Sequence, residues 1–380
     1  MKIALVRLRP FAQGGAETTL RYLVRGFLGR GHQVSVYGAG GDPRLAEALL
    51  GGARYLPVPV YGGSAGRALS FALNCRRLLR RGNQDVILSL ERTLCQQVYR
   101  AGDGCHREWL ARRRPFQHPL ANLAQGLRPF HRVMLYLERR VFRDPGLRLV
   151  IANSQQVREE MQHHYGVDDR KIRVIYNGLD RERFRPLRAG DRAELAARLG
   201  APPDDGVVLF VGSGFRRKGL AWLVKAFAGI APRRALLWVV GKDPGREYEK
   251  LAGRLRVADR VKFWGLQSDT APFYQAAAVL ALPTLYDPCS NAVLEALGCG
   301  TPVVTTTANG AAEFVTPRVN GALIPRADDV DGLQQALTEF LERREDEDGR
   351  RAAAQAVAHL DWGTTVAQTL ACLEEAAGAG

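Results

Sequence analysis

The sequence predicts an α/β fold built on parallel β-sheets. Short apolar runs of strand length alternate with segments of helical spacing, and glycines stand between them. The chain opens with the apolar run Ile3–Leu8, a loop that ends in Gly14 and Gly15, helical spacing over Glu17–Leu28 and a second apolar run at Val34–Tyr37. Strand, glycine loop, helix and strand form a βαβ unit, and such units build parallel sheets.

The same order continues through the first half of the chain. The glycine-rich region from Gly38 to Gly66 fits neither pattern and stays unassigned. The polar, proline-bearing stretch Arg185–Asp205 indicates a domain boundary near residue 185. The elements expected before it are a helix at Ala68–Leu79, strands at Val86–Leu90, Gln97–Tyr99 and Leu149–Ser154, and a helix that runs through Met161.

The second half repeats the opening. Val207–Gly212 predicts a strand, Ser213–Gly219 a loop and Leu220–Phe227 a helix. The segments LVRGF at 23–27 and LVKAF at 223–227 are similar, which indicates two Rossmann-like halves. The later elements expected are strands at Ala235–Val240, Val261–Trp264, Ala276–Leu282 and from Val303, and helices at Ala292–Leu297, Asp331–Glu342 and Trp362–Glu375.

The amino-acid composition limits which classes of protein the chain can belong to. At 380 residues and 46% hydrophobic, the chain is long and apolar enough for two or three domains with sizeable cores. The 54 Lys and Arg exceed the 39 Asp and Glu, and the resulting net charge of +15 favours an anionic partner. Nucleic acid, acidic lipid and phosphorylated substrates all meet that description, and charge alone does not choose among them.

Cysteine usage and hydropathy indicate the compartment. The six cysteines show neither a CxxC pair nor zinc-ligand spacing, so free thiols in a reducing compartment are expected. The first residues run directly into a strand that carries Arg7, unlike a signal peptide, and no apolar run approaches the roughly 18 residues of a membrane span. We expect a soluble, cytoplasmic protein.

The stretch LYDPCSNAVLEALGCGTPVV at 285–304 carries the strongest chemical signal. Asp287 falls in a loop after a predicted strand, and Ser290 or Asn291 begins a helix whose free N–H groups attract phosphate. Glu295 lies one turn further in. Two carboxylates and a row of amides could hold a sugar, a diphosphate and a ribose. A capped helix in an ordinary α/β domain explains this stretch equally well.

The loop GSGFRRKG at 212–219 is basic. Its glycines lie at 212, 214 and 219, which breaks the GxGxxG spacing of dinucleotide-binding folds, and Leu220 stands where a P-loop requires Ser or Thr. Arg217 and Lys218 could neutralise a diphosphate leaving group. Two surface cations are the alternative, which is disfavoured because cations at a helix start are costly without an anion.

Asp103 lies between two glycines just after a strand-like run, and His106 follows three residues later. Polar residues at such strand ends lie over the crevice of an open α/β sheet, although a loop-capping side chain is the alternative. Two Asp-x-Asp triplets, at 329–331 and 346–348, are interpreted as a helix cap and a solvated charge run, so no metal site is expected.

The region from Arg107 to Arg143 is rich in arginine. It contains nine arginines and only two glutamates, with apolar residues at helical intervals, among them Leu120, Leu123 and Leu127. This is typical of a basic amphipathic segment that binds an anionic membrane surface. A solvated charged face is nearly as good an interpretation.

Together these motifs resemble those of retaining GT-B glycosyltransferases, of the glycosyl transferases group 1 and family 4 type. The donor-sugar motif of that family has two glutamates separated by seven residues, and here the pair is Asp287 and Glu295. The loops GGAE at 14–17 and GSGFRRKG, and the segment that ends in VIYNGLD, also resemble the family in the expected order over nearly the whole chain. GSGFRRKG and the Asp103 segment are most similar to lipopolysaccharide core glucosyltransferases.

The resemblance implies a GT-B architecture, with two Rossmann-like domains whose parallel sheets face each other across a cleft. Residues 1–185 would form the acceptor domain, 186–360 the nucleotide-sugar donor domain, and 361–380 a helix that crosses back. The implied reaction is retaining, metal-independent transfer of a hexose, with glucose expected, from a UDP-sugar to a hydroxyl of a lipopolysaccharide core or related glycolipid or polysaccharide. No cofactor is implied beyond the donor substrate, and inner-membrane attachment through Arg107–Arg143 is an expectation.

The resemblance also implies residue roles. Arg217 and Lys218 would bind the diphosphate, Asp287 the sugar hydroxyls and Glu295 the ribose, and Asp103 would lie near the acceptor and the anomeric carbon. The catalytic set is therefore Asp103, Arg217, Lys218 and Asp287. The remaining donor-binding residues are Gly14, Gly15, Gly212, Trp264, Gly265, Asn291, Ala292 and Val293, with Trp264 and Gly265 beside the base. Asp287 is one methylene shorter than the family's glutamate, which leaves the donor sugar open.

Three alternatives remain. A basic nucleic-acid-binding protein would explain the charge, but the sequence shows no helix-turn-helix, zinc-finger or aromatic RNA-binding motif, so no nucleic-acid partner is expected. An NAD oxidoreductase conflicts with the glycine spacing. Another nucleotide-sugar protein of the same fold, such as an epimerase or a catalytically silent binder, stays open.

Overall fold

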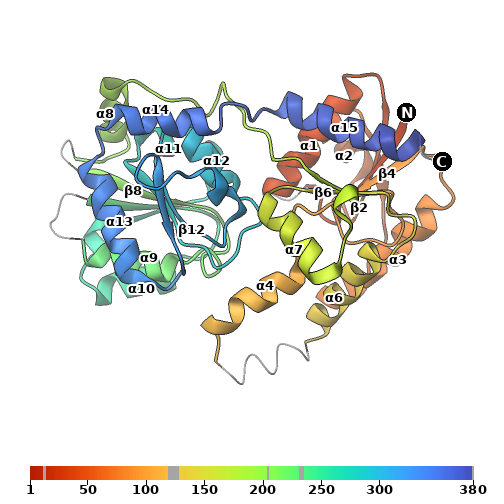
Figure 1. The fold of residues 1–380 in the computed structure, drawn as a ribbon, viewed down its shortest axis with the longest axis horizontal. Helices are drawn as coiled ribbons and strands as arrows, with labels where there is room; N and C mark the ends of the chain where they lie inside the picture. Colours follow the sequence, from red (N-terminus) through yellow and green to blue (C-terminus); the bar gives the residue numbers. More distant parts are fainter. Residues whose placement is uncertain (12–13, 119–127, 203–204, 231–234, 379–380) are drawn as a thin grey trace. The chain divides into compact units, whose positions relative to one another are not determined.

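A computed structural model describes residues 1–11, 14–118, 128–202, 205–230 and 235–378, and Figure 1 shows its ribbon. The chain forms two compact units. Unit 1 comprises residues 1–178 together with 362–380, and unit 2 comprises residues 179–361. None of the described helices is long and apolar enough to cross a bilayer.

Unit 1 is built on a parallel sheet with the order β3-β2-β1-β4-β5-β6-β7. Its described strands are β1 (Lys2–Val6), β2 (Gln33–Gly38), β3 (Arg54–Pro57), β4 (Val86–Ser89), β5 (Val98–Arg100), β6 (Leu149–Ala152) and β7 (Ile172–Val174). The register pairs Lys2 with Gln33 and Ile3 with Val86. Strand β1 lies in the middle of the sheet, and its side chains alternate between the two faces of the sheet. Because helices cover both faces, the side chains on each face are buried, which agrees with the apolar sequence of the strand.

Helices cover both faces of this sheet. Ile3 and Leu5 pack on one face with α1 (Gly15–Leu28) and α15 (Trp362–Gly378), whereas Ala4 and Val6 pack on the other with α3 (Ser64–Leu79). Helices α1 and α15 lie side by side (Figure 1), joined by the stacked rings of Tyr22 and Trp362 at 4.2 Å. The other described helices of unit 1 are α2 (Pro43–Leu49), α4 (His106–Arg113), η1 (Arg114–Phe116), α6 (Pro129–Phe142), α7 (Gln155–Tyr165) and η2 (Asp169–Lys171).

Unit 2 contains a second parallel sheet with the order β10-β9-β8-β11-β12-β13. Its described strands are β8 (Gly206–Val211), β9 (Ala235–Val240), β10 (Val261–Gly265), β11 (Val279–Leu282), β12 (Val303–Thr306) and β13 (Gly321–Ile324). Its described helices are α8 (Ala189–Arg198), α9 (Leu220–Ala228), α10 (Arg246–Arg254), η3 (Ala258–Arg260), α11 (Ala271–Ala276), α12 (Asn291–Gly298), η4 (Gly310–Phe314), α13 (Val330–Glu342) and α14 (Glu347–Ala356).

The two parallel sheets with surrounding helices confirm the predicted α/β class. The similar segments at 23–27 and 223–227 fall in α1 and α9, the first crossover helix of each unit, where Leu23 and Leu223 are both fully buried. Asp329 caps α13 by accepting from Gly332 N at 3.0 Å, which confirms the interpretation of the first acidic triplet.

Several local predictions were wrong. The apolar run from Ala276 does not begin a strand there, because Ala271–Ala276 forms α11 and β11 starts at Val279. The second acidic triplet, 346–348, is more than a solvated charge run: Asp348 is exposed as expected, but Asp346 caps α14 by accepting from Gly349 N at 2.9 Å. The unassigned region 38–66 contains α2 and β3. The expected apolar positions Leu120, Leu123 and Leu127 lie outside the described residues.

Candidate active site

The carboxyl edge of the unit 2 sheet gathers most of the predicted donor-binding residues. The loop Gly212–Gly219 follows β8, Asp243 follows β9, Gly265 ends β10 and Asp287 follows β11. Strand ends that are far apart in sequence meet here: Gly241 N donates to Gly265 O at 2.9 Å, and a Cβ on Gly241 would lie 2.2 Å from Gly212 O. In open α/β sheets, ligands bind at this edge.

The basic loop has a backbone that requires glycine. Gly212, Gly214 and Gly219 have φ values of 140°, 81° and 81°, and a Cβ on Gly219 would lie 2.0 Å from the Pro283 carbonyl oxygen. The Asp243 carboxylate accepts from the N–H groups of Gly214 and Phe215, each at 2.9 Å. These contacts fix the backbone of the loop, so the side chains of Arg217 and Lys218 extend from it in defined directions.

Arg217 and Lys218 converge on Asp287. Arg217 Nη1 donates to Asp287 Oδ2 at 3.1 Å and to Tyr286 O at 2.7 Å, and Lys218 Nζ donates to the same Oδ2 at 3.0 Å. Asp287 and Lys218 are each 7% exposed, whereas a third of the Arg217 side chain is accessible. Two cations and one carboxylate leave one positive charge in excess, and Arg217 presents it outward.

In this cluster, burial and the neighbouring opposite charges shift the pKa of each group in opposite directions. Burial alone would raise the pKa of the Asp287 carboxyl, but Lys218 and Arg217 outweigh it and lower that pKa below its ordinary value. Burial lowers the pKa of the Lys218 ammonium, and the attraction of Asp287 offsets only part of this effect. An additional anion at Lys218 would stabilise its charged form.

The start of α12 carries an unpaired buried hydroxyl. Ser290 occupies the N-cap position, but its side chain makes no capping bond, and its Oγ has no hydrogen-bond partner among the described residues although the residue is 3% exposed. Its backbone N donates to Asn309 Oδ1 at 3.2 Å. Of the three predicted backbone donors Asn291, Ala292 and Val293, Val293 N already donates to Ser290 O at 3.1 Å.

Glu295 lies one turn into α12 and accepts from the hydroxyl of Tyr274 at 2.8 Å. Burial raises the pKa of this carboxyl to about 7, although the Tyr274 hydrogen bond and the charges of Arg183 and Lys218 oppose the shift. Lys218 and Glu295 also influence each other electrostatically, and the raised pKa of Glu295 keeps part of it neutral near pH 7, so the positive excess at Arg217 and Lys218 remains.

Trp264 and Gly265 stand at the end of the edge strand β10. The Trp264 ring packs against Phe273 and Trp238, with centroids 5.0 and 5.6 Å away, and Lys262 Nζ lies 3.6 Å from its centroid. Gly265 is exposed, with φ +66°. The indole is thus held by neighbours, and the exposed backbone at Gly265 is the part of this pair open to a base.

Asp103, Gly14 and Gly15 lie in unit 1, where Arg7 organises a second charged cluster. Arg7 Nη1 lies 2.9 Å from Asp103 Oδ2 and 3.6 Å from Glu91 Oε2, and Arg7 Nη2 lies 3.0 Å from Glu17 Oε1. A Cβ on Gly14 would lie 2.7 Å from Glu17 Oε2, so glycine there leaves room for Glu17 to reach back to Arg7.

Sequence reasoning missed three members of this cluster: Arg7, Glu17 and Glu91. The sequence did contain one sign of this cluster, since Arg7 stands at the end of an apolar strand. A charge in that position requires polar partners. Burial raises the pKa of Glu91, and the opposing attraction of Arg7 does not cancel this shift. The Asp103 side chain is the most accessible of the three carboxylates, at 41%.

His106 does not join that cluster. It is buried, and its Nε2 lies 3.0 Å from His131 Nδ1. Burial and then the charge of Arg92 lower its pKa to about 3, so it is neutral at ordinary pH. Its backbone N donates to Glu138 at 2.8 Å, and Glu138 pairs with Arg92 at 2.9 Å. This part of the arginine-rich region is therefore a buried polar network as well as a charged surface.

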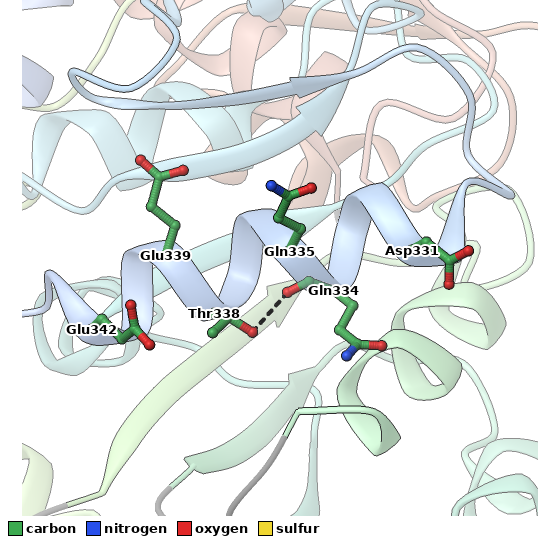
Figure 2. Close-up of a pocket in the computed structure, with 6 residues that line it drawn as sticks. All are labelled: Asp331, Gln334, Gln335, Thr338, Glu339 and Glu342. Atoms are coloured by element: carbon green, nitrogen blue, oxygen red, sulfur yellow. Dashed lines mark hydrogen bonds between the residues drawn. The ribbon is translucent and has the colours of Figure 1, made fainter.

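A shallow hollow of about 490 Å³ runs along α13 in unit 2. Figure 2 shows the six side chains that line it, among them Asp331, Glu339 and Glu342. None of the predicted site residues lines this hollow, and its acidic lining does not suit a nucleotide diphosphate.

Two family models match the chain, one on each unit. The model described as Glycosyltransferase Family 4 matches residues 13–183, and the model described as Glycosyl transferases group 1 matches residues 205–343. The chain belongs to the GT-B glycosyltransferases. The predicted family is thereby confirmed, with the group 1 match covering the charge cluster of Arg217, Lys218 and Asp287.

Curated relatives extend this result. The lipopolysaccharide glucosyltransferase WaaG of Escherichia coli K12 is 24% identical over 346 residues, which is 90% of each chain. A D-inositol 3-phosphate glycosyltransferase of Streptomyces bingchenggensis is 35% identical over 190 residues, which is 46% of this chain and 41% of that protein. The match thus spans less than half the length of the second relative.

Solved structures show the same GT-B fold. The crystal structure of WaaG has a TM-score of 0.83 at 22% identity, covering 98% of this chain and 99% of that one. Anabaena HepE in complex with UDP and glucose has a TM-score of 0.71 at 22% identity, covering 99% of this chain and all of that one.

Proposed function

We propose that the protein transfers a hexose, with glucose as the leading candidate, from a UDP-sugar to a hydroxyl of a lipopolysaccharide core or related glycolipid, with retention at the anomeric carbon. The observation that carries this proposal is the Arg217–Lys218 pair, which one buried carboxylate holds at the carboxyl edge of the unit 2 sheet. The similarity to a lipopolysaccharide glucosyltransferase supports the choice of sugar and acceptor.

The cation pair would bind the donor's diphosphate. Arg217 presents a flat fork of donors, and Lys218 contributes a point charge whose burial keeps water away from it. A diphosphate would meet the excess positive charge of the cluster and stabilise the ammonium of Lys218. As the bond to the sugar breaks, negative charge builds up on the leaving phosphate, and these cations would stabilise it without a metal ion.

Asp287 would have two roles. It would accept from sugar hydroxyls, and it would also fix the directions of Arg217 and Lys218, because it is the one carboxylate among the described residues that forms an ion pair with either of them. The unpaired hydroxyl of Ser290 and the backbone at the start of α12 would provide donors to the sugar or the phosphate. The expectation that Asp287 acts on the sugar alone is therefore revised.

The uridine would lie on the other side of the phosphates. The carboxylate of Glu295 would accept from the ribose hydroxyls, and the exposed backbone at Gly265 would border the base. Ribose hydroxyls favour the ionised form of Glu295, so binding of UDP would release a proton from the fraction of Glu295 that is neutral near pH 7.

Unit 1 would bind the acceptor. Three carboxyl groups around one arginine provide hydrogen-bond acceptors, and Asp103 is the most exposed of them. Sugar hydroxyls are donors that such a cluster can orient. Asp103 would hold the attacking hydroxyl, while Glu17 and Glu91 keep Arg7 in place.

In the proposed reaction the bond between the anomeric carbon and the β-phosphate oxygen breaks, and the acceptor oxygen bonds to that carbon on the same face. The acceptor's proton passes to the leaving phosphate. The products are UDP and the glycoside. No protein nucleophile and no redox partner are needed for the atoms to balance.

The direct test is incubation of the purified chain with a series of UDP-hexoses, a truncated lipopolysaccharide core acceptor and a chelator. We expect a hexosylated product from UDP-glucose, with the anomeric configuration of the donor retained in the proton spectrum. An inverted product would contradict the mechanism. Transfer only to inositol phosphate, or nucleotide release without transfer, would contradict the proposed acceptor.

Unit 1 also offers a basic surface for membrane attachment. Exposed arginines of α6, namely Arg132, Arg139 and Arg140, lie on the same helix as Tyr136, which is half exposed. Helix α3 packs beside α6, and four further arginines surround a hollow of about 350 Å³ at its end. They are Arg76 and Arg77 in α3 and Arg80 and Arg81 directly after it. We infer that this surface docks on anionic lipid, where each basic residue contributes about 1 kcal/mol.

Substitution of Arg132, Arg139 and Arg140 by Gln tests this docking. Binding to anionic vesicles should fall by about 100-fold, because three contributions of about 1 kcal/mol are lost. Transfer to a soluble acceptor should not change. The matched control replaces three exposed arginines elsewhere in unit 1, namely Arg21 and Arg25 of α1 and Arg30 just after it. Equal loss of vesicle binding in both variants would show that only net charge matters and would remove this surface from the proposal.

A further inference from the structure

Unit 2 contains two hollows of opposite charge. The hollow along α13 is lined by acidic and amide side chains (Figure 2). A second cavity of about 280 Å³ lies among α8, α12 and α14 and the segment 181–187, and four arginines and one carboxylate line it. The arginines are Arg181, Arg192, Arg350 and Arg351, and the carboxylate belongs to Glu347. None of the donor-site residues lines this cavity.

Two of these arginines are buried and are held by polar contacts with the protein. Arg192 is 6% exposed and lies 2.7 Å from Glu347 Oε1 and 3.2 Å from Glu345 Oε2. Arg350 is 5% exposed and donates to the carbonyl oxygens of Ala277, Gly300 and Arg344, at 3.0, 3.4 and 3.2 Å. Two buried guanidinium groups therefore lie in the wall of one cavity.

The charge of Arg350 is not neutralised directly. Among the described residues, its side chain donates to backbone carbonyls, and no carboxylate of those residues lies within ion-pair distance of it. Burial and then the repulsion of Arg192 lower its pKa to about 10. A guanidinium has five N–H groups, so two of those on Arg350 remain beyond its three carbonyl bonds.

A purely structural role explains only part of this arrangement. The carbonyl bonds of Arg350 join α14 to the end of α12, and Arg192 joins α8 to α14. Neither role requires Arg181 or Arg351, which are exposed at the cavity. Arg351 has a solvent-exposed partner, Asp348, at 2.9 Å, and exposed pairs contribute little.

We propose that this cavity is a second anion site, which binds a small phosphate-bearing ligand apart from the donor site. A phosphate group carries two negative charges near neutral pH and accepts several hydrogen bonds, which matches converging guanidinium forks. The cavity is large enough for such a group. Arg350 supplies a buried charge that no carboxylate among the described residues neutralises, and Arg192 adds a second buried guanidinium that is already paired with Glu345 and Glu347. The exposed Arg181 and Arg351 line the solvent side of the cavity.

The test is calorimetric titration of inorganic phosphate into the full chain, at constant ionic strength balanced with chloride. Three double variants accompany the parent protein. The cavity variant carries Arg181→Gln and Arg351→Gln, both at exposed positions. The control variant carries Arg198→Gln and Arg254→Gln, which remove the same charge from exposed positions on α8 and α10. The donor-site variant carries Arg217→Ala and Lys218→Ala.

We expect the phosphate dissociation constant to rise at least tenfold in the cavity variant, since two charge-assisted contacts are lost, and to stay unchanged in the control. The donor-site variant should keep this binding, which separates the result from the fate of the proposed glycosyl transfer. Equal phosphate binding by the cavity variant and the parent would overturn the proposal. Loss of all phosphate binding in the donor-site variant, or no binding by the parent at tens of millimolar phosphate, would overturn it as well.

Discussion

The two units place opposite charge clusters at the carboxyl edges of their sheets. In unit 2, one carboxylate, Asp287, lies between two cations. In unit 1, one cation, Arg7, lies among three carboxyl groups, and even with Glu91 protonated the remaining two exceed its charge. In each cluster one residue of the minority charge, Asp287 or Arg7, holds the others in place. The net charge is that of the majority, positive in unit 2 and negative in unit 1.

The proposed function assigns a different class of ligand to each unit on the basis of this difference. An excess of fixed positive charge suits a diphosphate, and an excess of carboxylates suits ligands that donate hydrogen bonds, such as sugar hydroxyls. In both clusters the minority residue, Asp287 or Arg7, sets where the opposite charges point, in addition to any contact of its own with a ligand. Removal of the minority residue should therefore be more damaging than its direct contacts with a ligand suggest.

Asp287→Ala gives the largest expected effect. It leaves Lys218 buried without a counter-charge, and loss of one partner of a buried pair costs about 3 to 5 kcal/mol. The free energy of unfolding of unit 2 and the affinity for UDP should both fall, the latter because the cations lose their direction. Denaturant unfolding and calorimetry measure the two effects.

Asp328→Ala is the matched control, since Asp328 pairs with Arg326 in the same unit at 2.9 Å but both side chains are partly accessible. It should lower stability by less than about 1 kcal/mol. If Asp287→Ala lost affinity only for the intact UDP-sugar and kept full affinity for UDP, Asp287 would act on the sugar alone and the comparison between the units would fail.

Asp103→Asn should have a smaller and different effect. It removes the accessible carboxylate of the Arg7 cluster while keeping its shape, so kcat/KM for the acceptor should fall about tenfold, the equivalent of one charge-assisted hydrogen bond. Affinity for UDP, measured by calorimetry, should not change. Asp168→Asn, which alters an exposed ion pair with Arg170 in the same unit, is the control. A parallel loss of UDP affinity in Asp103→Asn would contradict the separation of roles.

Glu295 gives the smallest effect, through pH. Because burial raises its pKa to about 7 from an ordinary 4.5, its neutral form stabilises the folded protein; this contribution is complete below pH 4.5 and is lost as the pH rises through about 7. UDP binding favours the carboxylate, so UDP affinity should rise a few-fold between about pH 6 and pH 8.

Glu295→Gln isolates that effect, because the phosphates of UDP titrate equally with both proteins. The variant should lack the part of the rise that the parent shows, and its stability should depend less on pH between about 4.5 and 7. Identical pH profiles of UDP affinity for parent and variant would show that Glu295 does not contact the ribose.

Local features of both clusters could be predicted from the sequence. The strand, the loop GSGFRRKG and the helix that follows are consecutive, so the positions of Arg217 and Lys218 at a strand end follow from local pattern alone. The helix that begins near Ser290 and contains Glu295 follows from its cap and its apolar spacing.

The pairing of these local features could not be predicted. Arg217 and Asp287 are 70 residues apart in sequence and meet only because β8 and β11 are neighbours in the sheet. Arg7 and Asp103 are 96 residues apart, directly after β1 and after β5, and β4 lies between those strands. Sequence spacing does not reveal strand order, so Arg7 remained an isolated charge and Asp287 a carboxylate without partners.

The most direct test of the cation pair compares UDP with uridine. Calorimetric titration of both ligands into the parent and into the double variant Arg217→Ala, Lys218→Ala separates the diphosphate from the base and the ribose. We predict that the parent binds UDP at least about 100-fold more tightly than uridine, since two charge-assisted contacts of roughly 1.5 kcal/mol or more are involved, and that the variant binds the two nearly equally. A double variant that keeps the parent's full preference for UDP would contradict the central claim.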